Sequence, residues 1–346
     1  MNATQNKIIN AIIKKAQDKC PESLALIGVY GSVLTGDTHE KSDLDLLLLI
    51  NDEKGRILSE GFILEDEDIG FDIYCTTFSM LNEDSEYEHP HISKLLDSEI
   101  VYVNENNEAY LNKLYKLRDK AKNIMNSNCR FEKAPKAFFE AEKYFAECIL
   151  ADSMGEAFIS SGAAVSYLFE ALMLYSGRYF KRGVKRNFEE LTSLSLPFDI
   201  KNLTLKVIES GSLSALKENL TSIFKEAKAF LKKEDKKEEP SRENLTGTYE
   251  EMYSNWRNKV QEAAKNGDVY ASFVNSASLQ FMLDDIANGV DIEKINLMDS
   301  FDPKNLCKNA ENFDNALSLY LKEYEKIGMK PHIYKNVDAF VENYLK

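Results

Sequence analysis

Ser42-Asp43-Leu44-Asp45 runs directly into Leu46-Leu47-Leu48-Leu49-Ile50, and this stretch decides the fold of the N-terminal part of the chain. The apolar run predicts a strand that is buried in a sheet. Side chains two positions apart on extended backbone point the same way, so Asp43 and Asp45 are expected to project together at the mouth of this strand. Two adjacent carboxylates are suited to holding a divalent cation.

Two further stretches bring polar residues toward this pair. Upstream, residues 24–30 predict another buried strand, which ends in Gly31 and Ser32, where a glycine lets the backbone approach a ligand closely. Downstream, residues 69–75 alternate as a strand does and carry a third acid, Asp72. The sequence therefore predicts three carboxylates that converge on one site beside the glycine.

The order of these motifs resembles the DNA polymerase beta-like nucleotidyltransferase superfamily: Gly-Ser, about ten residues, Asp-x-Asp before an apolar strand, and an acid on a later strand. The resemblance covers about the first third of the chain and implies a small mixed sheet flanked by helices. It also implies that Gly31 and Ser32 bind nucleotide phosphates at a helix N-terminus. It further implies that Asp43, Asp45 and Asp72 hold two Mg²⁺ ions.

Elementary chemistry gives a reason for these residue types. A nucleoside triphosphate carries several negative charges that three carboxylates alone would repel, so hard cations must lie between them. Two metal ions can clamp the attacking and leaving oxygens of an in-line displacement. Backbone N–H groups after Gly31 would add an anion site. Asp43, Asp45 and Asp72 are therefore the predicted catalytic and metal-ligating residues, with ATP or another nucleoside triphosphate as donor.

The composition limits the partners. The chain has 346 residues, enough for two domains, and its 43 Lys and Arg against 57 Asp and Glu give a net charge of −14. This charge matches a nucleic-acid backbone poorly, so we expect a small-molecule acceptor and no nucleic acid. The scattered cysteines, the polar N-terminus and the lack of an uninterrupted run of about 18 apolar residues predict a cytoplasmic protein without a membrane span.

The periodicity of the chain predicts an α+β protein. A helix comes first, then strands near residues 24–30, 43–50, 56–65, 70–76 and 100–103, and then helices near residues 110–125, 135–150, 156–180, 216–231, 249–264, 269–286, 306–327 and 337–345. We expect an N-terminal mixed-sheet nucleotidyltransferase catalytic domain at residues 1–105 and an all-helical bundle domain at residues 106–346. The charged run at 232–239 predicts an exposed linker or a solvated helix end, and the helical domain could divide into two sub-bundles near residues 232–247.

A sheet module followed by helices resembles the kanamycin and lincosamide type of antibiotic nucleotidyltransferase, in which a helical bundle supplies part of the acceptor pocket. A bundle glutamate acts as general base in the kanamycin enzyme, and Glu140 is the nearest positional candidate here. A solvated helix residue is the favoured interpretation of Glu140. Relatives can complete the active site across a dimer interface, so a homodimer stays open.

Three further features have two interpretations each. Five cations at residues 178–186 could grip a triphosphate, but we favour a helix C-terminus with Gly183 as the C-cap residue. His39 could lie beside a phosphate, and a surface loop is favoured. An aromatic and apolar stripe at helical spacing could stack on a base, and core packing is favoured. Its members are Tyr249, Met252, Tyr253, Trp256 and Val260.

The leading functional hypothesis is a metal-dependent nucleotidyltransferase that moves AMP, or another nucleoside monophosphate, to a hydroxyl of a small molecule and releases pyrophosphate. An antibiotic is one candidate acceptor. A second hypothesis keeps the chemistry and changes the acceptor to a protein side chain or a second nucleotide. A third is a nucleotide-binding regulator without catalysis.

Overall fold

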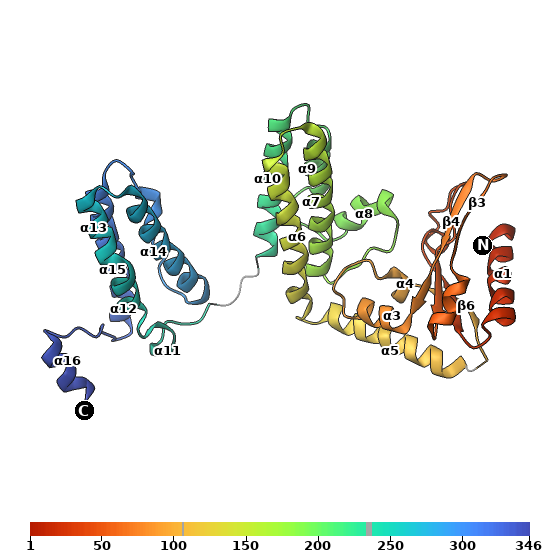
Figure 1. Ribbon diagram of the computed structural model, residues 1–346, viewed down its shortest axis with the longest axis horizontal. Helices are drawn as coiled ribbons and strands as arrows, with labels where there is room; N and C mark the ends of the chain where they lie inside the picture. The colour runs from red at the N-terminus through yellow and green to blue at the C-terminus, as the bar shows by residue number, and fades with distance from the viewer. Residues whose placement is uncertain (106, 233–236) are drawn as a thin grey trace. The chain divides into compact units, whose positions relative to one another are not determined.

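The computed structural model describes residues 1–105, 107–232 and 237–346, and the chain divides into two compact units, Met1–Lys233 and Glu234–Lys346 (Figure 1). The sheets and the helices α1 to α10 belong to the first unit, and α11 to α16 belong to the second. The boundary falls within the charged run that predicts a linker, although residues 233–236 of that run lie outside the described residues. The domain division at residue 105 stays a prediction.

A four-stranded mixed sheet forms the centre of the N-terminal region, as the sequence predicts. In sheet order its strands are β5 (Cys75–Thr77), β2 (Leu46–Ile50), β1 (Leu24–Val29) and β6 (Glu99–Val103). β1 is antiparallel to both β2 and β6, whereas β2 and β5 are parallel. β3 (Glu60–Leu64) and β4 (Ile69–Ile73) form a separate antiparallel hairpin.

Two predicted strands need correction. The first part of the predicted strand at 56–65 lies in the 3-10 helix η1 (Glu53–Leu58), which the side chain of Asp52 caps by accepting from the Lys54 N–H at 3.0 Å. The predicted strand at 70–76 is divided between β4 and β5, which belong to different sheets. Alternation alone does not reveal this change of partner strand, because extended backbone continues through it.

The continuous apolar run of β2 is explained by burial on both faces of the sheet. Leu46, Leu48 and Ile50 pack into a core that includes the apolar face of α1 (Ala3–Lys19), which lies along one side of the sheet (Figure 1). Leu47 and Leu49 point to the other face and join a second core. This strand therefore anchors the two aspartates that precede it to the buried centre of the sheet.

Helices complete the first unit. They are α2 (Ser32–Thr35), α3 (Phe78–Ser85), α4 (Ser93–Leu96), α5 (Asn107–Asn126), α6 (Arg130–Leu150), α7 (Met154–Tyr175), α8 (Asn187–Thr192), α9 (Ile200–Ile208) and α10 (Leu213–Leu231), with the 3-10 helix η2 (Val184–Arg186). Buried alanines such as Ala141, Ala157 and Ala164 lie in the core that α6, α7 and α10 share. Small side chains allow helices to approach closely, so these residues set the packing of the bundle.

The central helix α7 is, in the described part of the chain, the helix whose length and composition would let it cross a membrane. In this structure 61% of its apolar window is buried inside the protein, as for the core helix of a bundle. α7 ends at Tyr175 in a Schellman motif: Gly177 has φ 63°, its N–H donates to Leu174 O at 3.0 Å, and the Arg178 N–H donates to Met173 O at 2.9 Å. The prediction of a helix to residue 180 with Gly183 as its C-cap residue is therefore wrong.

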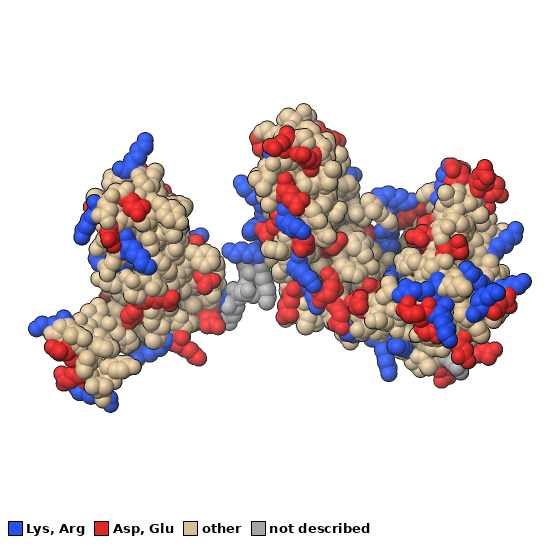
Figure 2. All heavy atoms as spheres, in the orientation of Figure 1, with Lys and Arg blue, Asp and Glu red and all other residues tan. Residues whose placement is uncertain are grey.

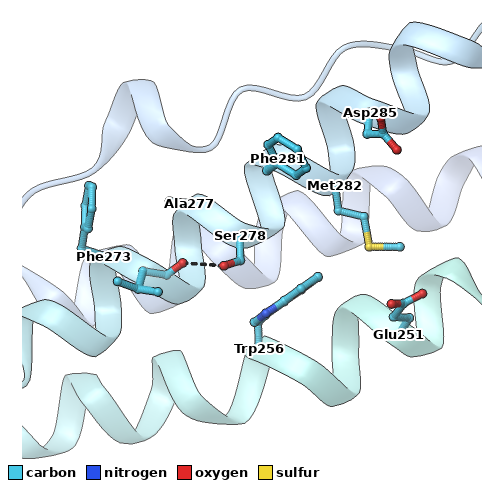
Figure 3. Close-up of a pocket in the computed structure, with 9 residues that line it drawn as sticks. Glu251, Trp256, Phe273, Ala277, Ser278, Phe281, Met282 and Asp285 are labelled. Atoms are coloured by element: carbon cyan, nitrogen blue, oxygen red, sulfur yellow. Dashed lines mark hydrogen bonds between the residues drawn. The ribbon is translucent and has the colours of Figure 1, made fainter.

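The second unit is a small helical bundle. Its elements are α11 (Arg242–Leu245), α12 (Thr248–Met252), the π-helical turn η3 (Tyr253–Arg257), α13 (Asn258–Asn266), α14 (Val269–Gly289), the 3-10 helix η4 (Met298–Ser300), α15 (Leu306–Lys326) and α16 (Val337–Tyr344). Met252 and Val260 are buried in its core, which confirms the packing interpretation for these members of the stripe. Trp256 is half-buried and faces α14 across a groove of about 670 Å³ (Figure 3).

Charged side chains of both signs are interspersed on the face shown in Figure 2. Acids gather at the tip of the β3–β4 hairpin, where residues 65–68 are four successive acids in a turn (Figure 2). Local charge, rather than the net charge of −14, therefore decides what each pocket attracts.

Candidate active site

The Gly31-Ser32 turn packs directly on Asp45. Beyond the end of β1 the Tyr30 N–H still donates to Asp45 O at 3.1 Å, which holds the two segments together. Gly31 has φ 70° and ψ −144° as the N-cap residue of α2, and a Cβ atom placed on it would lie 1.9 Å from Asp45 Oδ2. The Ser32 backbone N–H is hydrogen-bonded to the same carboxylate. Only glycine leaves room for this contact.

Asp43 and Asp45 share one side of the extended segment before β2. Leu44, between them, is buried, whereas Asp43 is exposed and Asp45 is half-buried, so the expected alternation is present. The pKa of Asp45 is raised above its ordinary value, first by burial and then by the negative charge of Asp43, and the Ser32 N–H opposes this rise. The pair therefore carries electrostatic repulsion that a bound cation would relieve.

Burial and this repulsion together raise the pKa of Asp45, and they predict that Asp45→Asn stabilises the protein when no metal is present. An acid with a raised pKa keeps its proton to higher pH in the folded state than in the unfolded state, so stability falls as pH rises through that interval and stays lower above it. At pH 7 with a chelator we expect a higher Tm for Asp45→Asn than for the wild type, measured by calorimetry. Added Mg²⁺ should then raise the wild-type Tm and leave the variant unchanged.

Asp52→Asn is the matched control, because Asp52 lies at the other end of β2. The pKa of Asp52 is lowered, first by a hydrogen bond with the Ser23 side chain, so its charge contributes stability above its unfolded pKa. This substitution should lower the Tm at pH 7. A Tm of Asp45→Asn at or below that of the wild type in chelator would contradict the assignment of repulsion to the pair.

Four of the five predicted site residues line one pocket of about 560 Å³. Gly31, Ser32, Asp43 and Asp45 are lining residues of this pocket. The other lining residues are Tyr30, Asp37, His39, Lys41, Ser42, Gly70, Ser93, Lys181, Arg182, Gly183, Val184 and Lys185. The pocket thus combines the two carboxylates with cations from a distant part of the sequence.

Asp72, the fifth predicted residue, does not line this pocket. It lies on the exposed face of β4 together with Gly70, which does line it, while Ile69, Phe71 and Ile73 point into the core. Within residues 1–105, 107–232 and 237–346, no group of three or more His, Cys, Asp or Glu is placed to hold a metal ion. The role of Asp72 stays a prediction.

The donor chemistry of the site fits a hard divalent cation at the carboxylate pair. Asp43 and Asp45 offer oxygen ligands, which Mg²⁺ prefers, and Mg²⁺ is commonly bound through one or two carboxylates together with substrate phosphates. The pKa of Asp45 is raised first by burial and then by the negative charge of Asp43, and a cation bound to the pair would offset this second cause. The site therefore suits a cation held by two carboxylates, and not a cation enclosed by three.

The segment after α7 carries three of the cations that line the pocket, and Lys41 is another. Lys181, Arg182 and Lys185 are lining residues. The Arg182 Nη2–H donates to Asp37 Oδ1 at 2.6 Å and its Nε–H donates to Asp37 Oδ2, so this pair is bidentate. The favoured interpretation of these cations as a helix C-terminus is wrong, because α7 ends before them and η2 follows Gly183.

Two other candidate residues from the sequence are His39 and Glu140. His39 lines the pocket and also lies on an exposed loop, where its Nδ1 accepts from the Lys41 N–H at 3.1 Å. Glu140 lies on α6 in a surface ion pair with Lys143 at 3.7 Å, as the solvated interpretation predicts. Asp37 and Lys41 also line the pocket, and the sequence does not predict them because single charged residues in a loop carry no spacing signal.

Comparison with known proteins gives a family match over the N-terminal part of the chain. Residues 9–141 match the family model described as nucleotidyltransferase domain, and this match supports nucleotidyl transfer as the general chemistry of this part of the chain. The matched region runs past residue 105 into α6.

One solved structure that is similar to the chain is the crystal structure of a nucleotidyltransferase-like protein from Exiguobacterium sibiricum 255-15. It shares 14% identity, with 81% of this chain and 91% of that chain covered and a TM-score of 0.38. No curated protein matches the sequence.

Proposed function

We propose that the protein is a metal-dependent nucleotidyltransferase that moves a nucleoside monophosphate, AMP when ATP is the donor, to a hydroxyl of a small molecule and releases pyrophosphate. The observation that carries this proposal is the single pocket that joins Gly31-Ser32, the Asp43 and Asp45 carboxylates and the cations of residues 181–185. The family match of residues 9–141 supports the same chemistry.

Each group of residues in the pocket has its own proposed role. Asp43 and Asp45 would hold Mg²⁺, which when bound neutralises phosphate charge and polarises the phosphoryl oxygens. The Ser32 end of the turn and the Lys181 and Lys185 ammonium groups suit the β- and γ-phosphates. Asp72, beside Gly70 on β4, is proposed as a further metal ligand or as the acceptor of the hydroxyl proton. The acceptor oxygen forms a bond to the α-phosphorus while the bond to pyrophosphate breaks.

The proposed acceptor is a small molecule. The volume of the pocket, about 560 Å³, lies within the range of small-molecule sites and would be shared with the nucleotide donor. Acceptors of the kind that kanamycin- and lincosamide-type enzymes modify are one class to test, and the helices that follow the sheet would shape their pocket. A protein or a nucleotide as acceptor is the alternative.

The test is an assay of the full-length protein with each of the four common nucleoside triphosphates, labelled at the α-phosphate, and Mg²⁺. We expect release of pyrophosphate that needs both Mg²⁺ and an added hydroxyl compound, with the label recovered on that compound. Label on protein, or on oligonucleotides formed without an added acceptor, would favour the alternative acceptors. Nucleotide binding without pyrophosphate release under any of these conditions would contradict catalysis and favour a nucleotide-binding regulator.

A further inference from the structure

The buried carboxylate of Asp37 lies in the loop that follows Ser32. Gly36, with φ 75°, ends α2 in the left-handed conformation, and the Asp37 N–H donates to Ser32 O at 3.2 Å. The chain thus turns back toward the start of α2, and the Asp37 side chain is only 4% exposed. A carboxylate at this depth requires partners, because an unpaired buried charge is costly.

Its partners come from residues 182–186. Arg182 binds Asp37 through Nε and Nη2, and Arg186 does so through Nε at 3.0 Å and Nη2 at 2.9 Å. Each arginine also donates its Nη1–H to the exposed carboxylate of Glu189. The Lys185 Nζ–H donates to the Asp37 main-chain oxygen at 2.7 Å. These pairs hold the pKa of Asp37 well below its usual range.

This cluster joins the two sides of the candidate pocket. Asp37 belongs to the loop that leads from Ser32 to the aspartates, whereas the arginines belong to the segment between α7 and α8. Lys181 and Lys185 line the pocket, and an ammonium group has three donors, of which Lys185 spends one on the Asp37 main chain. The remaining N–H donors of Lys185 are therefore available to bind a ligand.

We propose that Asp37 is a positioning residue, which fixes the segment 181–186 so that its cations meet the phosphates of the nucleotide. The inference rests on the proposed function, since it assigns a polyphosphate to this side of the pocket. Asp37 also lines the pocket, but the arginines engage both of its carboxylate oxygens and a carboxylate repels phosphate, so no contact with the nucleotide is assigned to it. Its effect would pass through Arg182, Lys185 and Arg186.

The negative charge of Asp37 has a second effect on the pocket, which opposes the positioning effect and makes the proposal testable. A carboxylate also neutralises the arginines, so if charge alone mattered, its removal would raise the positive potential of the pocket and tighten the binding of anions. If position matters more, removal would loosen the segment and weaken binding. The two interpretations therefore predict changes of opposite sign in the affinity of the pocket for anions.

The experiment compares Asp37→Asn with Glu189→Gln in the full-length protein. Both substitutions remove one negative charge from the same arginine pair, but only the first weakens the side-chain link to the Ser32 loop. With inorganic tripolyphosphate as a probe that has no base, calorimetry should give binding about 10-fold weaker or more for Asp37→Asn, in line with the loss of hydrogen bonds between charged groups. Glu189→Gln should bind as tightly as the wild type or more tightly.

Arg186→Lys covers the case in which Asp37→Asn does not fold. It keeps the charge and changes a residue that does not line the pocket, but lysine cannot reproduce the contact that two guanidinium nitrogens make with Asp37 Oδ1. We expect weaker tripolyphosphate binding, and in assays of turnover a higher KM for the nucleotide. A merely structural defect would lower kcat through the fraction of active protein and leave KM unchanged.

The outcomes separate the two proposals. If the wild type neither binds tripolyphosphate nor releases pyrophosphate, the proposed function fails. If the wild type does both while Asp37→Asn and Arg186→Lys bind the probe as tightly as the wild type or more tightly, the positioning role of Asp37 is overturned and the proposed function stands.

Discussion

Replacement of Asp43 or Asp45 by Asn is expected to slow nucleotidyl transfer by about 10²- to 10⁴-fold, which corresponds to about 3 to 5 kcal/mol of transition-state stabilisation. An amide keeps the shape of the side chain but loses the charge that would hold Mg²⁺ against the phosphates. The loss should be larger in kcat than in the affinity for tripolyphosphate in chelator, because the cations at 181–185 remain. Initial rates of pyrophosphate release at saturating Mg²⁺ measure it.

The control for this loss is again Asp52→Asn, at the opposite end of β2 and outside the pocket. It should keep the wild-type rate. Undiminished turnover in Asp43→Asn and in Asp45→Asn would refute the metal role of the pair. Asp72→Asn gives a separate result, since a loss there of similar size would place Asp72 in the reacting group even though it stands apart from the pair in this structure.

The sequence predicts that Gly31, Ser32, Asp43 and Asp45 lie close together because its signals there are local, and all four line one pocket. Asp43 and Asp45 are separated by one buried residue on an extended segment, and strand geometry alone makes them face the same way. Gly31 and Ser32 follow a buried strand that must pair with the strand after the aspartates, so the pairing of β1 and β2 brings the two motifs together. No long-range information beyond this one antiparallel pair is needed.

The position of the cations at residues 181–186 could not be predicted from the sequence, for a physical reason. Gly177 and Gly183 both follow α7, and either could end a helix. The choice depends on which glycine adopts positive φ, and in the structure Gly177 has φ 63° whereas Gly183 has φ −66°. If Gly183 is taken to end the helix, the cations are predicted to lie at the helix C-terminus. With Gly177 ending it, they lie in a loop that can reach Asp37, and no local sequence pattern indicates Asp37 as their partner.

The prediction for Asp72 shows a different limit. Alternation along β4 correctly gives the face on which the residue lies, since Phe71 and Ile73 are buried and Asp72 is exposed. The sequence does not give the sheet to which the strand belongs. β4 pairs with β3 in a hairpin and not with the central sheet, so the distance between Asp72 and the aspartate pair is set by the placement of that hairpin.

Gly31→Ala is expected to reduce the transfer rate by at least about 10²-fold, because a displacement of about 1 Å at reacting groups can cost that much. The new methyl group would occupy space within 1.9 Å of Asp45 Oδ2 and 2.7 Å of its Cγ, so the carboxylate must rotate away or the turn must open. Either movement separates the turn proposed to bind phosphate from the proposed metal ligand. The backbone conformation, φ 70° and ψ −144°, adds strain of about 1 to 3 kcal/mol for any residue with a Cβ.

Gly267→Ala separates strain from displacement. Gly267 has the same φ of 70°, and a Cβ placed on it meets nothing within 4 Å. It lies at the end of α13 in the second unit, so its substitution should lower the Tm while the rate stays at the wild-type value. If Gly31→Ala also lost only stability, the contact with Asp45 would have no part in the reaction.

A double variant identifies the contact as the cause. If the methyl group acts by displacing the Asp45 carboxylate, then Gly31→Ala adds little to the rate loss already present in Asp45→Asn, because both changes remove the same interaction. Independent effects would multiply instead, to a combined loss of about 10⁴-fold or more. Non-additive rates would show that Gly31 and Asp45 act as one unit, in which the glycine is required because the carboxylate occupies the place of its side chain.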